Sequence, residues 1–334
     1  MSFAAVQKPV RRELEQVQGL LRDAFRTSIP ILNRVGGHVL ATRGKKIRPT
    51  LLLLTARLRG PVGQDAVLSA AVVEMLHAAA LIHDDAVDSS VLRRGRPTVN
   101  GLWTDEMAII MGDYLFGHAL NVMVRHRLGL GLEVLTRVVG EMTGGEALEF
   151  QYAYDLGVTE AQYEELIRAK TGSLMGAATE IGAGLGRGAA ARRARAPFRE
   201  FGERLGTAFQ IVDDLLDYLG DPEVTGKPVG GDLAEGKVTL PLIAALREAG
   251  EADGRRLRRL ALRKRWTSGQ WSQLRALIEK CGGFAYARDR AAALAADSQR
   301  LLAGAGGRTA RDPGAAAARR ALERAVDHAV RRDR

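Results

Sequence analysis

The chain has 334 residues, 46% of them hydrophobic, so it is long enough to bury a sizeable core. Its start, MSFAAVQKPVRRELE, lacks the apolar stretch of a signal peptide, and its one cysteine, Cys281, excludes an internal disulfide, so we expect a cytoplasmic protein. The net charge of +10 is concentrated in Arg-rich segments 255–265 and 308–334, and only 5% of residues are aromatic, which favours solvated helix faces over a nucleic-acid-binding surface.

Apolar residues recur at intervals of three and four along almost the whole chain, and no segment alternates long enough with period two to predict a strand. The sequence therefore predicts an all-α protein of about ten helices or more. Apolar stripes lie at 14–25, 47–58, 66–86, 107–124, 132–150, 163–181, 198–219, 240–246 and 271–278. Thr159 with Gln162, and Thr267 with Gln270, match the capping box and predict two helix starts.

Glycine-rich breaks separate the predicted helices, and no fixed-period repeat is present. The breaks lie at 60–63, 95–101, 182–188, 220–231 and 304–314. The most apolar stretch, 66–82, contains a glutamate and a histidine, so we expect a buried helix there and no transmembrane segment. We predict a single domain over residues 1–334, a helical bundle, in which 304–314 is a flexible loop before a last helix at 315–330.

Two aspartate clusters stand out, HDDAVD at 83–88 and QIVDDLLD at 210–217. At ~100° per residue, Asp84 and Asp88 share a helix face, and so do Asp213 and Asp217. Carboxylate oxygens one turn apart suit Mg²⁺, which keeps several waters and bridges to substrate phosphates. One DDxxD alone is more often a solvated helix face, but this motif occurs twice beside apolar residues, where unpaired carboxylates are costly. We therefore predict that Mg²⁺ lies between the two clusters and that the clusters and the metal together bind a diphosphate.

Basic residues near these clusters could complete such a site. They occur in GKKIRP at 44–49, RRGRPT at 93–98, KTG at 170–172, GKP at 226–228 and EGK at 235–237. Taken singly, each is more often surface charge. Together they suit an enzyme that handles two diphosphates, because Arg binds phosphate with two parallel hydrogen bonds and Lys as a point charge. His77 lies two turns before Asp84 on nearly the same face, with a core histidine as the alternative.

These motifs resemble, in order, those of the trans-type isoprenyl diphosphate synthases, also called polyprenyl synthetases. GKKIRP, HDDAVD with RRGRPTVN, GDYLFGHAL, KTGSL, FQIVDDLLDY and GKPVGGDLAEGK together span residues 44 to 237. The resemblance implies an all-α bundle around a deep central cavity, a homodimer and three Mg²⁺ ions. It also implies head-to-tail condensation of isopentenyl diphosphate with an allylic diphosphate. Val238, where many long-chain members carry proline, is a mild departure.

The resemblance further implies roles for individual residues. Isopentenyl diphosphate is expected to bind Lys45, Arg48, His77 and Arg94. The allylic diphosphate is expected to bind Arg93, Lys170, Lys227 and Lys237. Thr171 and Gln210 are expected to line the reacting region and steady the carbocation. Asp84 and Asp88 are expected to coordinate two Mg²⁺ ions and Asp213 the third, with Asp85, Asp214 and Asp217 as further candidate ligands.

Product length is predicted from the helix ahead of Asp84. Along the predicted helix, Ala80 lies one turn, or ~6 Å, before Asp84, and Ala79 lies just beyond Ala80. In short-chain members of the family large aromatics often stand at these positions, whereas here both carry only a methyl group. We expect a long-chain enzyme, with a short-chain farnesyl or geranylgeranyl synthase as the alternative. In the other reading of these alanines, they simply pack well against a neighbouring helix.

Other functions compete with this interpretation. A class I terpene cyclase shares one DDxxD, but its second metal motif normally mixes Asp or Asn with Ser or Thr and Glu. A catalytically silent partner subunit typically loses one aspartate motif, whereas this chain has both. A nucleic-acid-binding module is disfavoured by the composition. As partners we expect the two diphosphate substrates and a second copy of the chain, with a transient membrane contact during product release and no nucleic acid; whether a second, different subunit is needed stays open.

Overall fold

The computed structural model describes residues 3–41, 44–93, 95–186, 188–220, 230–305 and 312–331. In these ranges the chain is almost entirely helical, and its only sheet is a two-stranded hairpin, so the predicted all-α class is confirmed. The chain forms two compact units. Unit 1 comprises Met1–Val139, Leu174–Gly202 and Arg300–Ala325, and unit 2 comprises Gly140–Ser173, Glu203–Gln299 and Val326–Arg334. The organisation as a single domain remains a prediction.

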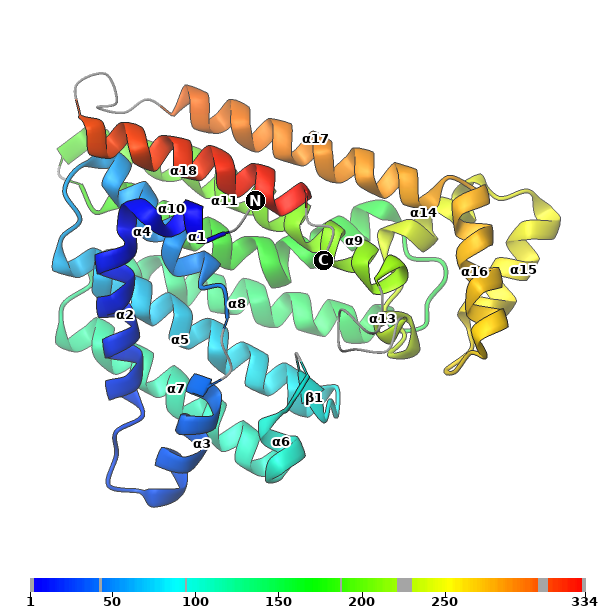
Figure 1. Cartoon of the computed structure of the whole chain (residues 1–334), viewed down its shortest axis with the longest axis horizontal. Coiled ribbons are helices and arrows are strands. Elements are labelled where there is room, and N and C mark those ends of the chain that lie inside the picture. Colours follow the sequence, from blue (N-terminus) through cyan, green and yellow to red (C-terminus); the bar gives the residue numbers. More distant parts are fainter. Residues whose placement is uncertain are drawn as a thin grey trace. The chain divides into compact units, whose positions relative to one another are not determined.

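Unit 1 is built around helix α5, which packs most extensively against α7 and also contacts α2 and α4. Its first elements are α1 (Ala4–Gln7), η1 (Lys8–Val10), α2 (Arg11–Ala24), α3 (Pro30–Ala41), α4 (Ile47–Arg59), α5 (Gln64–Val87), α6 (Val99–Leu102) and α7 (Asp105–Arg125) (Figure 1). Two of these helices, α5 and α7, are long and apolar enough to span a membrane. In α5, 72% of the apolar window is buried inside the fold, which identifies it as the predicted core helix.

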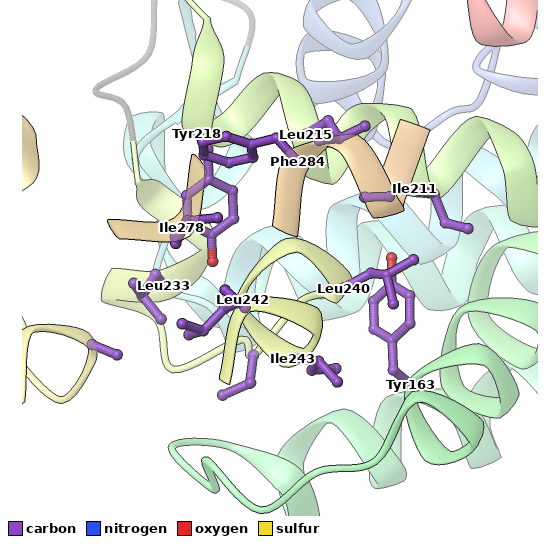
Figure 2. Packing of buried hydrophobic residues seen from close by; sticks show 14 of the residues in the cluster. Tyr163, Ile211, Leu215, Tyr218, Leu233, Leu240, Leu242, Ile243, Ile278 and Phe284 are labelled. Carbon is purple, nitrogen blue, oxygen red and sulfur yellow. The ribbon is translucent and has the colours of Figure 1, made fainter. Parts of the chain in front are cut away.

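Unit 2 has its own apolar core, part of which Figure 2 shows. The elements around it include α9 (Glu160–Ile167), η2 (Arg168–Gly172), α13 (Gly231–Ala234), α14 (Leu240–Glu248), α15 (Glu251–Ala261) and α16 (Ser268–Lys280). Tyr218 is fully buried in this core, stacked on Trp271 with ring centroids 5.7 Å apart and tilted against Phe284. Both predicted capping boxes are present, at the starts of α9 and α16.

The chain passes between the units inside continuous helices. These are α8 (Gly129–Tyr152), α10 (Ser173–Gly184), α11 (Gly188–Leu219), α17 (Gly283–Gly304) and α18 (Pro313–Val330). Helix α18 matches the predicted last helix, whereas α3, α15 and α17 were not among the predicted stripes. Most of the predicted loop at 304–314 lies outside the described residues.

Two local departures from the sequence analysis fall at candidate functional motifs. The stripe predicted as one helix over 163–181 contains a π-helical turn, η2, and this turn carries Lys170 and Thr171. Single π-helical turns inside α-helices are frequent at functional sites. The segment after Asp88, predicted as a loop, forms a short antiparallel hairpin from β1 (Leu92–Arg93) and β2 (Arg96–Pro97), with Gly95 at φ +71°.

Candidate active site

The first aspartate motif lies at the C-terminal end of α5, in unit 1. Asp84 and Asp88 are half-buried, and Asp88 caps the helix through its backbone N–H, which donates to the Asp84 carbonyl at 2.8 Å. The last turn of α5 contains no basic residue. Carboxylates at a helix C-terminus oppose the macrodipole, so this end of α5 favours a bound cation.

Asp85 differs from Asp84 and Asp88 because it is buried. Its carboxylate accepts a hydrogen bond from Arg93 Nε at 2.7 Å, and its backbone carbonyl accepts one from Asn100 Nδ2 at 3.1 Å. These bonds hold the β1–β2 hairpin and the start of α6 against the end of α5. Asp85 therefore fixes Arg93 beside the motif, while Asp84 and Asp88 keep more of their surface accessible.

The expected isopentenyl-binding residues of unit 1 come from α4 and α5. Arg48 Nη1 lies 2.9 Å from His77 Nε2, and because a guanidinium can only donate, His77 accepts at Nε2 and carries its proton on Nδ1. Lys46, in the left-handed conformation before α4, instead pairs with the buried Glu74 at 2.9 Å. Lys45, at the same turn, is exposed. Arg94 lies outside the described residues.

The second aspartate motif lies near the end of α11, in unit 2, and its three carboxylates have different environments. Asp213 is half-buried. Asp214 is buried and accepts hydrogen bonds from Tyr163 Oη at 2.7 Å and Gln210 Nε2 at 2.8 Å. Burial, reinforced by the negative charge of Asp232, raises the pKa of the Asp214 carboxyl. Asp217 accepts from the backbone N–H groups of residues 231 and 232, at 3.1 and 3.3 Å, which holds the start of α13 against α11.

Lys170 and Lys237 share a carboxylate in unit 2. Lys170 pairs with Glu149 and, at 2.7 Å, with Glu146, both on α8. Lys237 lies 3.9 Å from Glu149 and 2.8 Å from Glu235. These acidic partners were not among the predicted site residues. The predicted Lys227 lies outside the described residues.

The donor set of the two motifs fits Mg²⁺. Within the described ranges, no group of three or more His, Cys, Asp or Glu side chains could hold a metal alone. Each motif instead offers carboxylate oxygens one helical turn apart, which suits an ion that keeps waters and takes its other ligands from substrate phosphates. Asp84, Asp88 and Asp213 are half-buried, whereas Asp85 and Asp214 are buried, so the first three are the more accessible candidate ligands.

A glycine lets α8 approach the π-helical turn. A Cβ built on Gly145 would lie 2.7 Å from the backbone nitrogen of Lys170, closer than any real contact, whereas one built on Gly144 meets nothing within 4 Å. We therefore expect Gly145→Ala to displace the turn that carries Lys170 and Thr171. Both the melting temperature and the turnover should fall.

The matched control is Gly144→Ala, the same chemical change one residue earlier in α8. It should leave turnover unchanged and stabilise the helix by up to about 1 kcal/mol. Thermal unfolding and steady-state kinetics of the two variants check this. If both variants behaved alike, close approach at Gly145 would not matter for the turn.

Comparison with known proteins agrees with the resemblance. The model of the polyprenyl synthetase family matches residues 29–278. An all-trans-nonaprenyl-diphosphate synthase (geranyl-diphosphate specific) of Rhodobacter capsulatus is 37% identical over 284 residues, 85% of this chain and 86% of that protein. A short chain isoprenyl diphosphate synthase of Methanothermobacter thermautotrophicus is 39% identical over 253 residues, 74% of this chain and 77% of that protein.

A solved structure is similar over the whole chain. The polyprenyl synthase from Caulobacter crescentus, complexed with calcium and isoprenyl diphosphate, has a TM-score of 0.89 and 34% identity, covering 100% of this chain and 98% of that one. The chain belongs to the polyprenyl synthetase family. It is therefore a prenyltransferase of the isoprenyl diphosphate synthase type, as the sequence predicted.

Proposed function

We propose that the chain is a magnesium-dependent synthase of long-chain all-trans polyprenyl diphosphates, acting in the cytoplasm. The observation that carries the proposal is that each aspartate motif combines an accessible first carboxylate with a buried second one that anchors a neighbouring residue. The calcium in the similar Caulobacter crescentus structure supports a divalent cation. Asp84 and Asp88 would hold two Mg²⁺ ions and Asp213 a third, which when bound would stabilise negative charge on the diphosphate.

In this mechanism the cationic side chains bind and orient the two substrates. Arg93, Lys170 and Lys237 bind the allylic diphosphate, and Lys45, Arg48 and His77 bind isopentenyl diphosphate. Charge develops on the leaving diphosphate as the allylic C–O bond breaks, and fixed cations lower that barrier. The isopentenyl double bond then attacks the allylic carbon, and the proton lost from the new chain passes to the departing diphosphate. Arg94 and Lys227 keep the roles that the resemblance implies for them.

A terpene cyclase would need only the allylic substrate, so leaving out isopentenyl diphosphate separates the two functions. We expect the purified protein to consume geranyl or farnesyl diphosphate only when isopentenyl diphosphate is present. Gas chromatography of hexane extracts would detect a cyclase product. Hydrocarbon formed from the allylic substrate alone would contradict the proposal.

Long-chain specificity is supported by the small side chains ahead of Asp84. Ala80 is half-buried on α5, whereas Ala79 is only 3% exposed and belongs to a core cluster with Ile82 and Met111. We therefore expect Ala80→Phe to shorten the product while condensation continues. Ala79→Phe should shorten it only with a loss of about 1–3 kcal/mol of stability, because it overpacks a core.

Chromatography of the dephosphorylated products measures chain length directly. Ala80→Ser, which keeps a small side chain, is the matched control and should make the same product as the wild type. A wild-type product that stops at twenty carbons or fewer would instead favour the short-chain alternative, which the Methanothermobacter thermautotrophicus relative represents.

We also propose that the chain is a homodimer that pairs through an apolar face of α7. Ile109, Ile110 and Val124 are 49%, 51% and 65% exposed on this helix. Exposed apolar patches of this kind mark protein contacts. We expect Ile110→Asp to convert a dimer into a monomer in light scattering, whereas Leu262→Asp, at an exposed leucine after α15, should not. A wild-type monomer at micromolar concentration would contradict this.

A further inference from the structure

Four side chains of unit 2 form one continuous chain of hydrogen bonds. Tyr163 Oη donates to Asp214 Oδ2 at 2.7 Å, and Gln210 Nε2 donates to Asp214 Oδ1 at 2.8 Å. Thr171 Oγ1 then donates to Gln210 Oε1 at 2.9 Å. In Figure 2 the hydroxyl end of Tyr163 points from α9 toward α11, which carries Ile211 and Leu215. The chain of bonds thus runs from the buried core to the half-buried Thr171 of the π-helical turn.

The direction of these bonds is set by Asp214. A carboxylate only accepts, so the amide nitrogen of Gln210 must face Asp214 and its carbonyl must face Thr171. Burial, with the negative charge of Asp214, raises the pKa of the Tyr163 hydroxyl, so Tyr163 keeps its proton. If Asp214 carried a proton on Oδ2, that proton would be donated to the Tyr163 oxygen, which can also accept. Oδ1 would still accept from Gln210, so the direction of the Gln210 and Thr171 bonds would not change.

The hydroxyl of Thr171 is placed unusually for a helical threonine. Thr55, Thr136 and Thr207 donate to the carbonyl four residues earlier in their own helices, as threonines in helices commonly do. Thr171 instead donates to another helix, and within the described part of the chain its hydroxyl makes no other hydrogen bond. Its proton is therefore committed to Gln210, which leaves its oxygen lone pairs available for a ligand.

The close approach of the turn to α11 depends on Gly172. A Cβ on this residue would lie 3.0 Å from the Glu203 carbonyl oxygen and 3.1 Å from Thr207 Oγ1. With hydrogen at this position, the turn comes near enough to α11 for Thr171 to reach Gln210. The sequence Lys-Thr-Gly therefore joins a cation, a hydroxyl and a contact glycine in three consecutive residues.

We propose that Asp214 is a positioning residue, which fixes the Gln210 amide and thereby aims the lone pairs of the Thr171 hydroxyl at the electron-deficient allylic carbon. This inference rests on the proposed function. With the amide reversed, its NH₂ group would donate to Thr171, whose own O–H would then turn outward and present a positive dipole to a developing cation. A dipole that already points toward the developing charge lowers the barrier to ionisation, because it need not reorient during the reaction. Its loss should therefore lower kcat and leave substrate binding unchanged.

The test is a double-mutant cycle between Asp214→Asn and Thr171→Val. Asn is close in shape and can bond Tyr163 and Gln210 in either orientation, so the fold is kept but the amide direction is lost. We expect kcat to fall about tenfold, with both Michaelis constants and the Mg²⁺ midpoint within about twofold of wild type. In the Thr171→Val background, which has no hydroxyl to aim, Asp214→Asn should cause no further loss.

A second variant, Tyr163→Phe with Asp214→Leu, replaces the buried pair by apolar groups and should couple to Thr171→Val in the same way. Tyr286→Phe is the control, because it removes a similar tyrosine–carboxylate bond to Glu160 elsewhere in unit 2 and should leave kcat unchanged. Losses that multiply, a rise in Michaelis constants, or an unaltered kcat in the Asp214 variants would overturn the inference. A wild-type protein without condensation activity would instead overturn the proposed function.

Discussion

Replacing Asp84 or Asp213 by alanine is expected to lower turnover by about 10²–10³-fold or more while leaving the helical content intact. Each substitution removes an accessible carboxylate from a cluster that we propose binds Mg²⁺, and with it stabilisation of the leaving diphosphate. The fold should not suffer, because neither side chain is fully buried. At Asp84 the change even removes a negative charge from a helix C-terminus that has no basic residue in its last turn.

Steady-state assays over a range of Mg²⁺ concentrations, with circular dichroism as the check on folding, measure this effect. Asp289→Ala is the matched control, since Asp289 is an exposed aspartate on α17 outside the proposed site. Its turnover should equal that of the wild type. Near-normal turnover in a folded Asp84 or Asp213 variant would refute the metal assignment.

The second large expected effect distinguishes the residues that bind isopentenyl diphosphate from those that bind the allylic diphosphate. Arg48→Ala should raise the Michaelis constant for isopentenyl diphosphate by about 10–100-fold, because a charged hydrogen bond contributes about 1.5–3 kcal/mol. Lys45→Ala should act in the same direction. Lys237→Ala should instead weaken use of the allylic diphosphate, since Lys237 meets Lys170 at the shared Glu149 carboxylate.

The kinetics are measured by varying one substrate while the other is saturating. Arg59→Ala provides the control on the same helix, because Arg59 bonds the Ala190 carbonyl and lies at the far end of α4 from Arg48. It should leave both constants unchanged. If Arg48→Ala and Lys237→Ala affected the two substrates equally, the division into two binding groups would be wrong.

Much of the fold could be predicted because it depends on local patterns. Apolar periodicity predicted the long helices, and the capping boxes at Thr159 and Thr267 are present in the structure. The most apolar stretch is the buried part of α5. Helix α17 was missed because Ala and Arg dominate it, and α15 was anticipated only as an Arg-rich solvated helix face because it contains just two leucines.

The candidate site was harder to predict where a residue's role depends on a partner distant in sequence. Asp85 and Asp214 look equivalent to their neighbours in a DDxxD motif, and only tertiary contacts with Arg93 and Tyr163 distinguish them. Tyr163 gave no functional signal, because an aromatic in an apolar stripe is normally core. Glu146 and Glu149 carried a weak functional signal, because a spacing of three residues puts both carboxylates on the same side of a helix.

Incubating the purified protein with radiolabelled isopentenyl diphosphate, Mg²⁺ and allylic primers of several lengths tests the central claim most directly. We predict that the label enters a product of more than twenty carbons, in the hexaprenyl to decaprenyl range, measured after dephosphorylation. Omission of the primer or chelation of Mg²⁺ should abolish incorporation. No incorporation of label with any primer, in a correctly folded protein with Mg²⁺ present, would contradict the account.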